Sequence, residues 1–162
     1  MSERRNVTDA RHLLIVFHSR SGGTRALADA VIAGATAAEI EGVEVRAQRA
    51  EGTDAGDVRW CDAIIIGTPE NFGYMSGLIK DFLERIFYVV VDETPSLPYG
   101  LFVKGGHDGE GAIRSIERIV TGLRWKQVLP PVLVTGETTH ADLARCRELG
   151  ITLAAGLEAG VF

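Results

Sequence analysis

A short loop rich in hydroxyl groups and glycine follows the first apolar run of the chain, residues 13–17. The residues after the loop, from about 24 to 38, are rich in alanine and typical of a helix. The loop would therefore lie at a helix N-terminus, where unpaired N–H groups and the helix dipole attract an anion. We expect a phosphate group there, bound by Ser19, Arg20, Ser21, Gly22, Gly23 and Thr24. Taken alone, the loop is explained equally well as a plain turn and helix cap.

The sequence lacks the other common motifs for phosphate binding or nucleophilic catalysis. It has no GxxxxGK(S/T), GxGxxG, GxSxG or HExxH segment. A phosphatase of the CX5R type would need a cysteine where this loop has His18 or Ser19, and a receiver domain would need an aspartate at Gly67-Thr68. No side chain is therefore available as the nucleophile of a phosphoryl transfer.

Two further loops combine residue types that suit a flat ligand. One runs from Gly67 to Gly77 and mixes a proline and glycines with Phe72 and Tyr74, as in the wall of a pocket for a planar group. The other runs from Lys104 to Gly111 and has four glycines among residues 105–111, so backbone amides can approach a ligand closely. The structural alternatives are aromatic side chains folded into the core and a merely mobile glycine loop.

Five apolar runs predict strands, and the segments between them have helical periodicity. Continuous runs, typical of buried parallel strands, occupy residues 13–17, 63–66, 100–103 and 132–134. Residues 43–47 alternate and predict an edge strand. Helices are expected near residues 24–38, 78–87 (with Ser76 as N-cap), 113–123 and 143–157, and a loop through Gly52 and Gly56. This order predicts a doubly wound α/β sheet, in which ligands bind beyond the carboxyl ends of the strands, where all three loops lie.

The loop motifs resemble those of a known family. Residues 19–24 resemble the phosphate loop of the flavodoxins, (S/T)-x-T-G-x-T, with Ser21 in place of the usual threonine. Gly67-Thr68-Pro69 and the segment from Phe72 to Gly77, with the helix up to Arg85, are similar to WrbA-type flavodoxins and NAD(P)H-dependent FMN reductases. The resemblance extends from His12 to Leu157. It implies a five-stranded parallel sheet in the order 2-1-3-4-5, with helices on both faces, and FMN as the cofactor.

The resemblance also implies where FMN would bind. Residues 19–24 would hold the phosphate, residues 68–73 would lie along the isoalloxazine ring, and the loop after 100–103 would face its pyrimidine edge. These two ring segments contribute Thr68, Pro69, Glu70, Asn71, Phe72, Gly73, Gly105, Gly106, His107, Asp108 and Gly111. The flavin would carry the chemistry, so no catalytic side chain is assigned. The other histidines are scattered, and no metal is assigned either.

Charged residues near these loops have two interpretations. Lys104 and His107 near the ring edge would stabilise an anionic reduced flavin, and Asp108 and Glu110 would oppose this. An exposed loop histidine is the alternative for His107. Arg20 and Arg25 flank the phosphate loop, where flavodoxins use neutral donors, and each is either a phosphate ligand or a solvated surface charge.

The loop after residues 100–103 lacks the tyrosine that stacks on the flavin in many flavodoxins. An open ring face favours an NAD(P)H-dependent oxidoreductase that reduces quinones or other small acceptors. Its partners would be a nicotinamide nucleotide and a small electron acceptor, with the protein a monomer or homodimer. The alternatives are an electron carrier that serves a redox partner protein, and a flavodoxin-like binding module without a cofactor.

The composition fits one soluble globular domain. We expect a polar N-terminal extension over residues 1–11 and a single domain over residues 12–162. The net charge of −5 argues against nucleic-acid binding. The longest apolar run, residues 86–91, is too short for a membrane helix, and the polar N-terminus does not resemble a signal peptide, so we expect a cytoplasmic protein. Cys61 and Cys146 are expected to be buried, with a chance disulfide as the alternative.

Overall fold

A seven-stranded, mainly parallel sheet forms the centre of the computed structural model, which describes residues 9–162. The strands are β1 (Arg11–Phe17), β2 (Val43–Arg49), β3 (Ala63–Asn71), β4 (Tyr74–Met75), β5 (Pro98–Gly105), β6 (Lys126–Gln127) and β7 (Val132–Thr135). They are arranged in the order β2-β1-β3-β5, with β6 and β7 both paired to β5 and β4 antiparallel to β3. Without the two-residue strands β4 and β6, this is the predicted order 2-1-3-4-5, which is confirmed.

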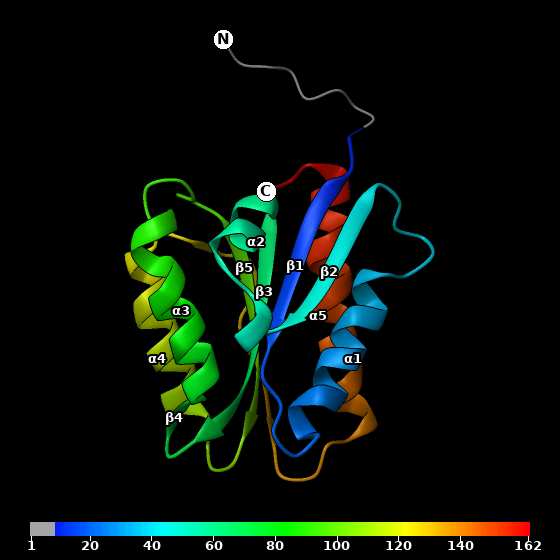
Figure 1. The fold of residues 1–162 in the computed structure, drawn as a ribbon. Coiled ribbons are helices and arrows are strands. Elements are labelled where there is room, and N and C mark those ends of the chain that lie inside the picture. The colour runs from blue at the N-terminus through cyan, green and yellow to red at the C-terminus, as the bar shows by residue number, and fades with distance from the viewer. Residues whose placement is uncertain (1–8) are drawn as a thin grey trace.

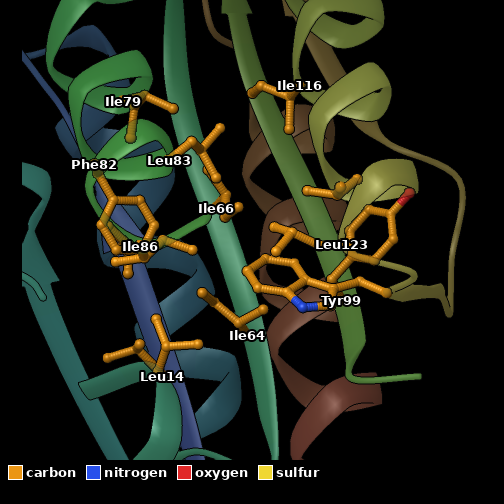
Figure 2. Packing of buried hydrophobic residues seen from close by; sticks show 14 of the residues in the cluster. Leu14, Ile64, Ile66, Ile79, Phe82, Leu83, Ile86, Tyr99, Ile116 and Leu123 are labelled. Carbon is orange, nitrogen blue, oxygen red and sulfur yellow. The ribbon is translucent and has the colours of Figure 1, made fainter. Parts of the chain in front are cut away.

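Helices cover both faces of the sheet (Figure 1). They are α1 (Gly23–Ala35), η1 (Ala50–Gly52, a 3-10 helix), α2 (Ala55–Trp60), α3 (Gly77–Val90), α4 (Glu110–Gly122) and α5 (His140–Ala159). Side chains of β1 and β3 alternate between the two faces: Leu14 and Ile64 pack with α3 and α4, whereas Leu13 and Ile65 pack with α1 and α5. Figure 2 shows the first of these clusters, with Phe82 of α3 opposite the β3 side chains.

Two features differ from the prediction. The expected loop through Gly52 and Gly56 is instead η1 and α2. The helix α2 begins because the carboxylate of Asp54 accepts hydrogen bonds from the N–H groups of Gly56 and Asp57, and Asp57 reaches back to the N–H of Asp54. Strand β3 is also longer than expected, because its last residues pair with both β4 and β5.

The structure also bears on the predictions for the N-terminal segment, the two cysteines and membrane helices. β1 begins at Arg11, which pairs with Val43, so the sheet begins one residue before the expected domain boundary. Residues 1–8 of the expected extension lie outside the described residues. Cys61 and Cys146 are buried, free and on opposite faces of the sheet, so the disulfide interpretation is wrong. Within residues 9–162, no helix is both long and apolar enough to cross a membrane.

Two glycines allow α1 and α5 to approach each other closely. A β-carbon at Gly34 would lie 2.0 Å from the carbonyl oxygen of Arg147, and one at Gly150 would lie 2.0 Å from that of Val31. Both obstacles are backbone atoms inside helices, which cannot move aside locally. The helix pair, and with it the position of α1 on the sheet, therefore depends on the absence of these β-carbons.

Gly150→Ala should destabilise the protein by about 1–3 kcal/mol, because the methyl group overpacks this contact despite the better helix propensity of alanine. Gly52→Ala is the control, since nothing lies within 4 Å of its β-carbon position. It should leave stability unchanged or slightly higher. Urea denaturation followed by circular dichroism measures both, and equal stability of the two variants would contradict the packing argument.

Candidate cofactor site

The loops after β1, β3, β5 and β7 lie together at the carboxyl end of the sheet, the lower end in Figure 1. Three of them are the loops that the sequence singled out. The fourth, residues 136–139 between β7 and α5, was not predicted to contribute. A hydrogen bond from the N–H of His18 to the carbonyl oxygen of Gly67 (3.1 Å) joins the first two loops.

The N-terminus of α1 has unused hydrogen-bond donors. Its N-cap, Gly22, has a φ of +93° and no side chain to cap the helix. The N–H of Arg25 donates to Ser19 Oγ (3.1 Å), but within residues 9–162 the N–H groups of Gly23 and Thr24 have no acceptor. Thr24 as a residue is 2% exposed, and its hydroxyl has no hydrogen-bond partner among the described residues. Two amides and a hydroxyl are therefore available to an anion.

The arginines near this loop either bond to other protein groups or are exposed to solvent. Arg49 donates a hydrogen bond from Nη2 to the carbonyl oxygen of Ser19 (2.9 Å) and forms an ion pair with Glu51. It therefore stabilises the loop. Arg25 is exposed and pairs with Asp29 (2.9 Å). Arg20 and Ser21 are exposed. The arrangement favours the surface-charge interpretation of Arg25.

The segment 68–73 is mostly strand rather than loop. Thr68 to Asn71 continue β3, and only Phe72 and Gly73 form the turn into β4, with φ values of +54° and +69°. Both residues of such a two-residue hairpin turn need a positive φ, which is unusual for phenylalanine. The Phe72 side chain is fully exposed, so it does not fold into the core. The buried Thr68 hydroxyl accepts a hydrogen bond from the N–H of Ser76 (3.0 Å), which fixes the hairpin to the start of α3.

A buried carboxylate joins the hairpin to the loop after β5. Glu70 is 7% exposed, and its Oε1 accepts a hydrogen bond from the N–H of His107 at 2.6 Å. Its Oε2 is also buried but has no hydrogen-bond partner. Gly106, His107 and Asp108 are exposed, which matches the loop-histidine interpretation of His107. Glu70 therefore connects two walls of the site and keeps one acceptor atom free for a donor.

The other two residues that were predicted to face the ring from the loop after β5 lie in a strand and a helix. Gly105 is the last residue of β5, and Gly111 lies in the first turn of α4. A β-carbon at Gly111 would be 1.8 Å from the carbonyl oxygen of Gly73, so the start of α4 packs directly on the hairpin turn. The close approach accounts for a glycine at position 111, and only residues 106–109 form the connecting loop.

Lys104 was expected near the ring edge, but its side chain packs against α1. Lys104 Cγ lies 3.5 Å from the position that a β-carbon of Gly23 would occupy. Its ammonium group donates hydrogen bonds to the carbonyl oxygen of Gly136 and to Thr138 Oγ1 (3.2 Å). The β7–α5 loop is thus tied to the phosphate-loop side of the site.

His18, which the sequence analysis left without a role, is a titratable group whose pKa this environment alters. Its Nδ1 is buried without a hydrogen-bond partner. Burial lowers the pKa of its imidazole, the charge of Glu51 opposes this, and Arg49 and Arg20 lower the pKa further. Its position directly after the first buried strand was the sequence signal that could have identified it. Among residues 9–162, no group of three or more His, Cys, Asp or Glu side chains is placed to hold a metal ion.

The sheet order and the loops at its carboxyl end define a doubly wound α/β protein of the flavodoxin type. The family model described as "Flavodoxin" matches residues 15–150, and the chain belongs to that family. The resemblance seen in the sequence is thereby confirmed. Membership of this family implies FMN as the cofactor.

Individual relatives agree with this assignment. A flavodoxin from Aquifex aeolicus (strain VF5) is 32% identical over 74 residues, which are 46% of this chain and 39% of that protein, so the match spans well under half of its length. A flavodoxin from the domain Archaea has a TM-score of 0.78 at 22% identity, over 91% of this chain and 99% of the other. A WrbA-like flavodoxin from Agrobacterium tumefaciens has a TM-score of 0.74 at 22% identity, over 93% and 99%. These two structures show the shared fold.

The lowered pKa of His18 predicts a loss of stability in mild acid. The unfolded chain takes the ordinary value of 6.5, so below that pH it binds more protons than the folded protein. Stability should therefore fall as the pH drops through 6.5 and level off below the folded-state pKa. His18→Gln should lose less stability over this interval, as measured by urea denaturation at a series of pH values. His140→Gln, at an exposed position, is the control, and parallel curves for wild type and His18→Gln would refute the prediction.

Proposed function

We propose that this protein binds FMN at the carboxyl end of its sheet and transfers electrons through it. The observation that carries the proposal is the N-terminus of α1, where the unpaired N–H groups of Gly23 and Thr24 and the hydroxyl of the buried residue Thr24 fit a phosphate group. When bound, FMN supplies the redox chemistry, and the protein contributes binding, orientation and electrostatics.

The proposed contacts follow the three loops. Ser19 to Thr24 hold the phosphate, with Arg20 at the exposed margin. Residues 68–73 and 105–108, with Gly111 behind them, form the two walls for the ring. Glu70 Oε2, buried and unpaired, is the acceptor suited to an N–H group of the flavin. Phe72 is the aromatic side chain available to contact the ring, and because it is fully exposed, binding FMN would reduce its contact with water.

The phosphate contact is tested by comparing FMN with riboflavin, which lacks the phosphate. Thr24→Val keeps the branched shape but removes the hydroxyl, so FMN should bind roughly tenfold more weakly while riboflavin is unaffected. Quenching of flavin fluorescence measures both dissociation constants. Thr121→Val, at an exposed position in α4, is the control. Equal affinity of the wild-type protein for FMN and riboflavin would refute the phosphate site, and no flavin binding at all would favour the cofactor-free binding module.

For the reaction itself, we propose an NAD(P)H-dependent oxidoreductase that reduces quinones or other small acceptors in the cytoplasm. The supporting observation is the open loop after β5, where residues 106–108 are exposed and residues 105–111 include no Tyr, Phe or Trp. An open wall allows a nicotinamide to approach the ring to the roughly 3–3.5 Å needed for hydride transfer. An electron carrier for a redox partner protein is the second candidate, and membership of the flavodoxin family favours it.

Anaerobic stopped-flow mixing separates the two functions. An oxidoreductase should lose its oxidised flavin absorbance when mixed with NADH or NADPH, faster than free FMN under the same conditions, and should then turn over with a quinone. If neither nucleotide reduces the holoprotein within minutes while dithionite does, the carrier function replaces the oxidoreductase. Gel filtration of the same sample decides between a monomer and a homodimer.

A further inference from the structure

Side chains alternate between the two faces of the sheet along β5, and this alternation places the Lys104 side chain beside the N-terminal end of α1. This side chain lies on the same face of the sheet as that of Phe102, which packs in the cluster beneath α1 and α5. Lys104 Cγ and Cε lie 3.5 Å and 3.8 Å from the β-carbon position of Gly23, the first residue of α1. The four-carbon stem therefore covers the start of the helix and carries its ammonium group to that end.

The partners of the ammonium group leave its charge uncompensated. Both of them, the carbonyl oxygen of Gly136 and the hydroxyl of Thr138, are neutral. Glu137 lies between these residues in the loop, but neither it nor any other carboxylate of residues 9–162 forms an ion pair with Lys104. An ammonium group has three N–H donors, so two are used and one is left.

Lys104 differs in this respect from the arginines around the loop. Arg25 and Arg49 are each paired with a carboxylate, Asp29 and Glu51 respectively. Arg20 is exposed, so water screens its charge. Lys104 is half-buried and is tied to the protein at two points. A fixed, partly desolvated cation attracts an anion more strongly than a mobile, hydrated one.

We propose that Lys104 is the charged ligand of the phosphate pocket and that it makes the site selective for a flavin bearing a phosphate monoester. The unpaired N–H groups of Gly23 and Thr24 and the hydroxyl of the buried residue Thr24 supply neutral donors, and the third N–H of Lys104 supplies the charge. The β7–α5 loop thereby becomes part of the cofactor site, because Gly136 and Thr138 orient the ammonium group. The inference rests on the proposed binding of FMN.

The inference is tested by measuring the affinity of each variant for both FMN and riboflavin. Lys104→Met keeps much of the apolar stem but removes the charge, so the dissociation constant of FMN should rise roughly tenfold and that of riboflavin should not change. Lys104→Arg should retain most of the preference for FMN. The matched control is Lys126→Met, since Lys126 is exposed in β6, which pairs with the opposite end of β5. An equal change for both flavins, or no change for either, would overturn the role of Lys104.

A second measurement uses the wild-type protein and does not depend on folding of a variant. The chain has only three lysines, Lys80, Lys104 and Lys126. FMN should protect Lys104 from acetylation by acetic anhydride, riboflavin should not, and Lys80 and Lys126 should react alike in all samples. Equal labelling of Lys104 with both flavins would overturn the inference. If the wild-type protein binds FMN no more tightly than riboflavin, the phosphate site itself fails, which is a separate result.

Discussion

The site depends on a row of neighbouring residues at which β1 ends and beyond which β3 and β5 continue for only a few residues. Phe17, Gly67 and Phe102 are neighbours across these three strands. The ring of Phe102 occupies the space of a β-carbon at Gly67, with a ring carbon 2.0 Å from that position. The close contact leaves no room for a side chain at this point of β3. All three predicted binding segments begin within a few residues of this row.

The sequence predicted the fold because strands that are buried on both faces of the sheet have a clear hydrophobic pattern. Continuous apolar runs such as residues 63–66 mark strands covered by helices on both sides, and the alternating run at 43–47 marked the edge strand β2. Short elements carry too few residues for such a pattern. The helix α2 has a single fully buried side chain, Val58, and depends mainly on the local hydrogen bonds of Asp54 and Asp57.

The site was predictable in its segments but not in its contacts. Glycine and hydroxyl residues at the end of a buried strand identify the α1 loop, because Gly22 has a positive φ and Ser19 accepts a hydrogen bond from the N–H of Arg25. The direction of a long side chain is set by residues distant in the sequence. Lys104 packs on Gly23 and reaches residues 136–138, and nothing in the local sequence distinguishes this from a position beside His107. The pairing of Glu70 with the His107 N–H is likewise a contact between separate loops.

The two ends of the proposed FMN site differ in burial and in hydrogen bonding. The phosphate end consists of a helix terminus, the buried Thr24 and the tethered Lys104. The ring end consists of an exposed hairpin turn with Phe72 at positive φ and an exposed glycine loop, joined by the hydrogen bond from the His107 N–H to Glu70 and by the packing of Gly111 on Gly73. In the proposed function the phosphate takes no part in electron transfer, so contacts there would bind the cofactor equally well before and after the reaction. Such a division allows the ring end to stay open to an electron donor or acceptor without loss of the cofactor.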